Sequence, residues 1–210
     1  MSYTFKDLYK FSEDFIEEKC STADCEEIFV PVPRLARELA RHIDWLRRVD
    51  FYPIQDTTRD DKVWGMYERI ADQDAAYEVE NSEIVTIAHG GWQNRCYKRF
   101  VCTKELLHVF DHSSERVSSE PQYGLLTNEI EDIQEVETRP SKLSPQMLSE
   151  IRAQWRAMLI LCPKGERDKI VADVGGNEHA WAYKYAIPQG LIETIKSPAY
   201  DRAYDDIILN

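Results

Sequence analysis

Arg99-Phe-Val-Cys-Thr-Lys-Glu-Leu-Leu-His-Val-Phe-Asp-His112 has the periodicity of an amphipathic helix. Its polar residues gather on two adjoining stripes, namely Lys104, His108 and Asp111 on one and Glu105, His108 and His112 on the other. Apolar residues occupy the opposite side. The segment is therefore predicted to pack into a core while it presents carboxylates and imidazoles together on its other face.

Further helices and a small β unit are predicted around this segment. Helical periodicity is present in 5–19, 35–49, 92–112, 129–137 and 145–162. Ser144 and Pro145 are start signals for the last of these, and Pro163 is a stop signal. Candidate strands are 62–70, 77–79 and 82–88. This order predicts an α+β fold, a mainly helical single domain with a small β-sheet packed on the helix that contains 99–112.

The composition restricts the class of protein. The 210 residues include 26 Lys+Arg and 38 Asp+Glu, which gives a formal net charge of −12. This balance argues against a protein that mainly binds nucleic acid, which needs clustered Lys and Arg, and against a polybasic membrane anchor. The sequence has no signal-peptide pattern and no apolar run of the ~20 residues that span a bilayer. With an odd count of five cysteines, this predicts a cytoplasmic protein with reduced thiols.

A run of arginines marks the helix predicted over 35–49. The exposed side of that helix would carry Arg34, Arg37, Arg41, Arg47 and Arg48. Two interpretations stay open at this point, an ordinary solvated helix face and a docking surface for an acidic partner.

The histidines of the first segment allow a metal site in principle. His108 and His112 are four residues apart, a spacing at which two neutral imidazoles can share one divalent ion. An ordinary polar helix face has the same pattern. Glu105 and His108 also match the Glu-x-x-His element of di-iron bundles, but such sites need a second element, which the chain lacks.

Residues 82–112 resemble the core of the ImmA/IrrE-type metallopeptidases. In that family a strand leads through a turn to an Arg-Phe-x-x-x-His-Glu-x-x-His helix, and here the strand corresponds to 84–87 and the Arg-Phe pair to Arg99-Phe100. Downstream, Arg152-Ala-Gln154 and Leu159-Ile-Leu-Cys-Pro163 are similar to the family's Glu-Ala-Asn helix and Leu-Leu-Met-Pro turn. The resemblance covers residues 30–165 and implies a zincin-like scaffold with an HExxH-like helix.

The same resemblance places cations at two ligand positions. Lys104 corresponds to the first zinc histidine, Glu105 to the general base, His108 to the second histidine and Arg152 to the third ligand. Zinc in such a site needs three protein ligands and an open position for water. An arginine keeps its proton, and a lysine ligates only with a strongly lowered pKa. We therefore expect an ionic cluster of Lys104, Glu105 and Arg152 with His108 nearby, without a cofactor and without catalytic residues.

Three functions follow as alternatives for a chain divided into an N-terminal helix (1–27), a peptidase-like core (28–165) and a C-terminal helical extension of the same domain (166–210). The first is a catalytically inactive metallopeptidase-like regulator that binds a protein or peptide, such as a transcriptional repressor, and binds neither nucleic acid nor membrane. The second is an active zinc-dependent endopeptidase that cleaves a helix-turn-helix repressor through displaced ligands, His108 and His112 with Asp111 or Glu150. The third is a structural or assembly protein.

Overall fold

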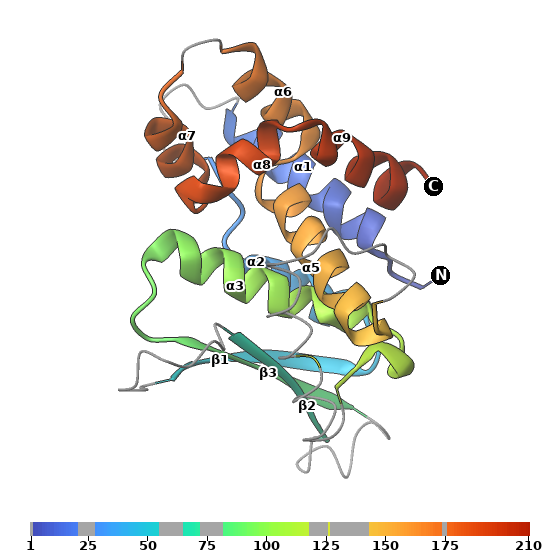
Figure 1. The fold of residues 1–210 in the computed structure, drawn as a ribbon. Coiled ribbons are helices and arrows are strands. Elements are labelled where there is room, and N and C mark those ends of the chain that lie inside the picture. The colour runs from blue at the N-terminus through green and yellow to red at the C-terminus, as the bar shows by residue number, and fades with distance from the viewer. Residues whose placement is uncertain are drawn as a thin grey trace.

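Three strands form a mixed sheet at one end of the molecule (Figure 1). The computed structural model describes residues 2–20, 28–54, 65–71, 82–117, 126, 143–173 and 176–210. Strand β3 (Glu83–Gly90) is central, parallel to β1 (Leu46–Ile54) and antiparallel to β2 (Gly65–Ala71). Val85 and Ile87 of β3 are completely buried because the helices cover one face of the sheet.

Helix α3 (Arg95–Leu107) lies across the sheet, and α2 (Val32–His42) packs beside it against β1 (Figure 1). Helices α1 (Phe5–Cys20) and α5 (Pro145–Leu161) form the next layer. The far end from the sheet is built by α6 (Lys164–Ala172), α7 (Glu178–Tyr185), α8 (Ile192–Lys196) and α9 (Pro198–Tyr204). Short turns of helix lie at His108–Phe110, Ser113–Glu115, Gln189–Leu191 and Asp205–Leu209. The predicted mainly helical α+β domain is confirmed.

One hydrophobic core joins these layers. Leu8 of α1, Leu35 of α2, Leu106 of α3 and Leu159 of α5 are all completely buried in it. Each helix contributes an apolar stripe at helical spacing, and burial of those stripes stabilises a layered arrangement that no single helix would maintain.

The start signals predicted for α5 are present in the structure. The Oγ of Ser144 accepts a hydrogen bond from the backbone N–H of Met147 at 3.1 Å, and Pro145 opens the helix. The helix ends at Leu161, two residues before Pro163. Candidate strands 62–70 and 82–88 correspond to β2 and β3. The candidate strand 77–79 and the helix predicted over 129–137 lie outside the described residues.

Two predicted helix ends were wrong. The helix predicted over 35–49 ends at His42, and 46–54 instead forms β1. The β-branched and aromatic residues Val49, Phe51 and Tyr52 favour a strand, and pairing with β3 satisfies their backbone groups. The second helix, predicted to continue through His112, ends at Leu107 and continues only as a short 3-10 turn.

The sequence analysis predicted no membrane-spanning segment, and the helices of the structure can be compared with that prediction. Among the described residues, no helix has the length and apolar character needed to cross a bilayer. The apolar faces of the helices pack against other helices and against the sheet.

Candidate functional site

A close packing of α3 on α5 builds the site. Along α5, Ser149, Ala153 and Ala157 recur every four residues, and none of them is more than 1% exposed. Small side chains on this stripe allow the two helix backbones to approach. Polar residues of α3 and Glu150 of α5 therefore meet where the two helices cross.

The ammonium group of Lys104 lies between two carboxylates. Its Nζ donates to Glu150 Oε2 at 2.5 Å and lies 3.0 Å from Glu105 Oε1. Burial alone would lower the pKa of Lys104, but the charges of Glu105 and Glu150 outweigh it and raise the pKa above its ordinary value. Burial likewise opposes ionisation of Glu150, yet Lys104 and His108 hold its pKa below its ordinary value. The lysine therefore remains a cation and Glu150 an anion at neutral pH.

His108 is also held as a cation. Its Nδ1 lies 2.6 Å from Asp111 Oδ2, and its Nε2 lies 3.3 Å from Glu150 Oε1 and 3.8 Å from Glu105 Oε2. Burial disfavours the charged imidazole, but the contacts with Asp111 and Glu150 and the charges of Glu150 and Glu105 raise its pKa to about 9. An imidazolium has protons on both nitrogens and no lone pair for a metal.

Asp111, which follows the short 3-10 turn after α3, completes the group. Its Oδ2 also accepts a hydrogen bond from the Oγ of Ser149, and its Oδ1 lies 3.8 Å from Arg156 Nη1. We call the six charged residues the ionic cluster: the cations Lys104, His108 and Arg156, and the carboxylates Glu105, Asp111 and Glu150. The cluster is neutral, which is what allows so many ionised groups to be buried together.

Strand β2 closes over the cluster at one edge of the sheet. The ring of Tyr67 lies 5.9 Å from the His108 ring, centroid to centroid. At Gly65 the backbone of β2 comes so near α3 that a Cβ would lie 2.9 Å from the Cγ of Glu105, and closer still to Val101. The glycine is required here for close approach of strand and helix.

Replacing Gly65 with alanine is expected to lower the free energy of unfolding by about 1–3 kcal/mol, because the methyl group forces β2 away from α3. Urea unfolding would measure this loss. Gly190→Ala is the matched control, since a Cβ there meets nothing within 4 Å. Equal stability of the two variants would show that β2 is not tightly seated on the cluster.

The structure separates the residues predicted to form the site. Lys104, Glu105 and His108 lie together, as described above. Arg152 lies apart, with its Nη1 2.8 Å from Glu115 Oε1. The reason is helical geometry: two residues along α5 turn the side chain by about 200°, so Glu150 and Arg152 point to different faces.

His112 does not join His108. The chain is extended at this residue (φ −68°, ψ 155°), where it caps the turn Ser113–Glu115 and is exposed. A shared ion at a spacing of four residues requires that both histidines be helical, and here the helix has already ended. The alternative ligand set of His108, His112 and Glu150 is therefore only partly assembled, through His108 and Glu150.

Sequence reasoning missed two members of the site. Ser149 and Arg156 are seven residues apart and share one face of α5, the face that also carries Ala153. The stripe of small residues was the available signal, because it identifies the side of α5 that lies closest to α3.

The ionic cluster does not fit a zinc ion. Zinc would have to displace the Lys104 ammonium, which occupies the space between the two carboxylates, and would also have to compete with the proton that His108 holds. Among the described residues, no group of three or more His, Cys, Asp or Glu side chains is arranged to hold a metal. What the cluster can do chemically is hold α3, α5 and β2 in a fixed relation.

No protein-family model, curated protein or solved structure matches the chain. The link to the metallopeptidases therefore remains a resemblance of residues.

Proposed function

We propose that the chain is a catalytically inactive, metallopeptidase-like protein that regulates by binding another protein. The observation that carries this proposal is the Lys104 ammonium between Glu105 and Glu150. In metallopeptidases of the ImmA/IrrE type, a metal would supply the charge that balances such carboxylates and would activate water. Here a side chain of the protein itself supplies that charge.

The burial of the cluster supports the same proposal. The side chains of Glu105 and Asp111 are 5% and 1% exposed. A general base must come within hydrogen-bond reach of the water or group that it deprotonates. Glu105 is instead ion-paired to Lys104 and covered by Gly65 of β2. A carboxylate enclosed in this way is poorly placed for hydrolysis.

The partner would be a protein or peptide, such as a helix-turn-helix repressor, bound in the cytoplasm without cleavage. The acidic net charge of −12 makes nucleic acid and anionic membranes unfavourable partners. A scaffold that keeps its shape after losing its metal can still present a binding surface, which is why we favour a regulator over a purely structural protein.

Metal content provides the direct test. Wild-type protein incubated with zinc and examined by native mass spectrometry is expected to carry no stoichiometric zinc. The variant Lys104→His is expected to bind about one zinc per chain, because it supplies an imidazole four residues before His108 and removes the competing ammonium, with Glu150 as third ligand. Lys104→Gln is the matched control, since it removes the same charge without adding an imidazole ligand.

Each outcome has a definite meaning. One zinc per wild-type chain, lost in His108→Ala, would replace this proposal with an active zinc peptidase. A Lys104→His variant that stays folded and free of zinc would remove the argument that α3 and α5 keep a metallopeptidase-like geometry. A pull-down in which the wild type and Glu105→Gln both retain an intact partner protein would support binding without cleavage.

A further inference from the structure

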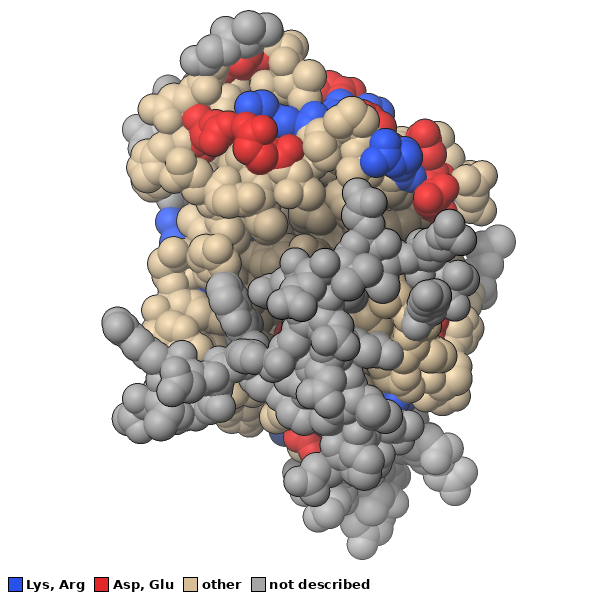
Figure 2. Space-filling view, viewed as in Figure 1, with Lys and Arg blue, Asp and Glu red and all other residues tan. Residues whose placement is uncertain are grey.

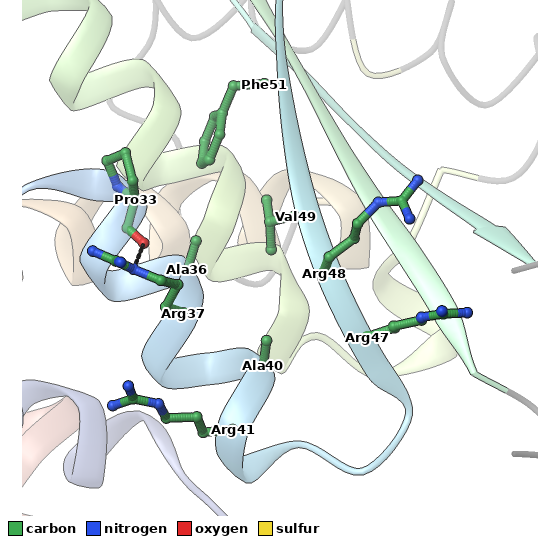
Figure 3. A pocket seen from close by; sticks show the side chains of 9 residues that line it. All are labelled: Pro33, Ala36, Arg37, Ala40, Arg41, Arg47, Arg48, Val49 and Phe51. Atoms are coloured by element: carbon green, nitrogen blue, oxygen red, sulfur yellow. Dashed lines mark hydrogen bonds between the residues drawn. The ribbon is translucent and has the colours of Figure 1, made fainter. Parts of the chain in front are cut away.

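A groove lies between α2 and β1 (Figure 3), on the edge of the sheet opposite β2. Its volume is about 660 Å³. It lies apart from the ionic cluster, which lies between α3, α5 and β2. The groove is therefore a different site from the ionic cluster, and it gives the proposed protein binding a surface of its own.

The groove has an apolar floor. Ala36 and Ala40 of α2 face Val49 and Phe51 of β1 (Figure 3). Val49 and Phe51 are two residues apart, so they stand on the same face of the strand. A ligand that fits this floor would place apolar side chains on it at a similar spacing.

The borders of the groove are basic. Arg37 and Arg41 project along the α2 side, and Arg47 and Arg48 extend beyond β1 (Figure 3). Among the nine lining residues, all of them described, four are arginines and none is acidic. On a chain with a net charge of −12, such a local excess of cations is unexpected and favours an acidic ligand.

The C-terminal helices carry cations and carboxylates side by side. There the two signs are mixed on the surface (Figure 2). Lys164 and Arg167 both pair with Asp201, and Lys196 pairs with Glu178 and Glu193. Two of the groove arginines also have a carboxylate nearby, Arg41 with Glu38 at 3.5 Å and Arg48 with Asp50 at 3.0 Å, but these carboxylates lie outside the lining, which remains basic.

The edge of β1 suits an extended ligand. Within the described sheet, β1 pairs with β3 on one side only, so its other edge is the boundary of the sheet beside the groove. Extended peptides add to such edges through backbone hydrogen bonds, with alternate side chains pointing to opposite faces.

We propose that this groove binds an extended acidic segment of a partner protein. Apolar side chains of the segment contact Val49 and Phe51, and the alternate Asp or Glu side chains pair with the arginines at the borders. Arginine suits this role because its planar guanidinium binds carboxylates with two parallel hydrogen bonds. A nucleic acid would also meet the arginines, but it has no apolar side chains for the floor and is repelled by the acidic chain as a whole.

A labelled nine-residue peptide alternating glutamate and valine, matched to the length of β1, tests the groove by fluorescence anisotropy. We expect it to bind about tenfold more tightly than the same peptide with glutamine in place of glutamate, and more weakly as salt rises. The double variant Arg37→Glu/Arg41→Glu is expected to lose about tenfold or more in affinity for the acidic peptide.

A matched control separates the groove from the overall charge. Arg202→Glu/Lys98→Glu makes the same charge change on α9 and α3, outside the groove lining, and should leave the affinity within about twofold. The substituted residues are all exposed, and circular dichroism would verify that both double variants fold. Equal binding of the glutamate and glutamine peptides, or an equal loss in both double variants, would overturn the proposal. So would tighter binding of a single-stranded oligonucleotide that depends on Arg37 and Arg41.

Discussion

Replacing Lys104 with methionine is expected to lower the free energy of unfolding by about 3 kcal/mol at pH 7. The change keeps most of the side-chain volume but removes the ammonium between Glu105 and Glu150. The two carboxylates would then face each other in a largely buried site without the cation that compensates them. Urea unfolding followed by circular dichroism would measure the loss.

Two comparisons make this expectation specific. Lys98→Met changes an exposed lysine of the same helix and should alter stability by no more than about 0.5 kcal/mol. Lys104→Met combined with Glu150→Gln removes the Lys104–Glu150 pair and leaves only Glu105 without the lysine, so it should recover about half of the loss, since an unpaired buried charge costs more than an absent pair. A Lys104→Met variant as stable as Lys98→Met would mean that the ammonium does not compensate the carboxylates.

The sequence was most informative about features set by local chemistry. The cap at Ser144, the opening Pro145 and the stop at Pro163 act within a few residues, and they placed α5 correctly. The β-branched run of β3 likewise identified the central strand. Lys104, Glu105 and His108 could be grouped because they belong to one predicted helix.

Features that depend on distant partners were harder to predict. Strand β1 becomes a strand through pairing with β3, some thirty-five residues further along the chain, whereas its local pattern also fits a helix. The face of α5 that meets α3 determines which α5 residue joins the cluster, and the sequence alone did not identify that face. A two-residue difference along α5, between Arg152 and Glu150, decided whether the cluster gains a cation or a carboxylate.

That carboxylate changes the electrostatics of the whole site. With Arg152 in place, the cluster would have carried an excess of positive charge, and His108 would have had reason to stay neutral. With Glu150 in place, His108 faces three carboxylates, from Glu105, Asp111 and Glu150. The charged state of this histidine is the most direct consequence of the observed geometry, and it makes stability depend on pH.

Between pH 6.5 and pH 9, the wild type is expected to lose about 3 kcal/mol of the free energy of unfolding through His108. The pKa of His108 is raised from 6.5 to about 9 in the folded state, so the folded protein holds this proton more tightly than the unfolded chain. The stabilisation is therefore fully present below pH 6.5, and it disappears as the pH rises through 9. At higher pH the neutral imidazole leaves Asp111 and Glu150 without one of their cations.

Two measurements would establish this dependence. The difference in stability between the wild type and His108→Asn should shrink as the pH rises from 6 to 10, because the variant has no proton to lose at this position. Proton NMR of the His108 ring should show a titration midpoint near 9. Asp111→Asn should move that midpoint toward 6.5, since the Asp111 carboxylate is the partner at 2.6 Å. A wild-type midpoint at or below 6.5 would mean that His108 is neutral at physiological pH, and one argument against metal binding at this histidine would then be lost.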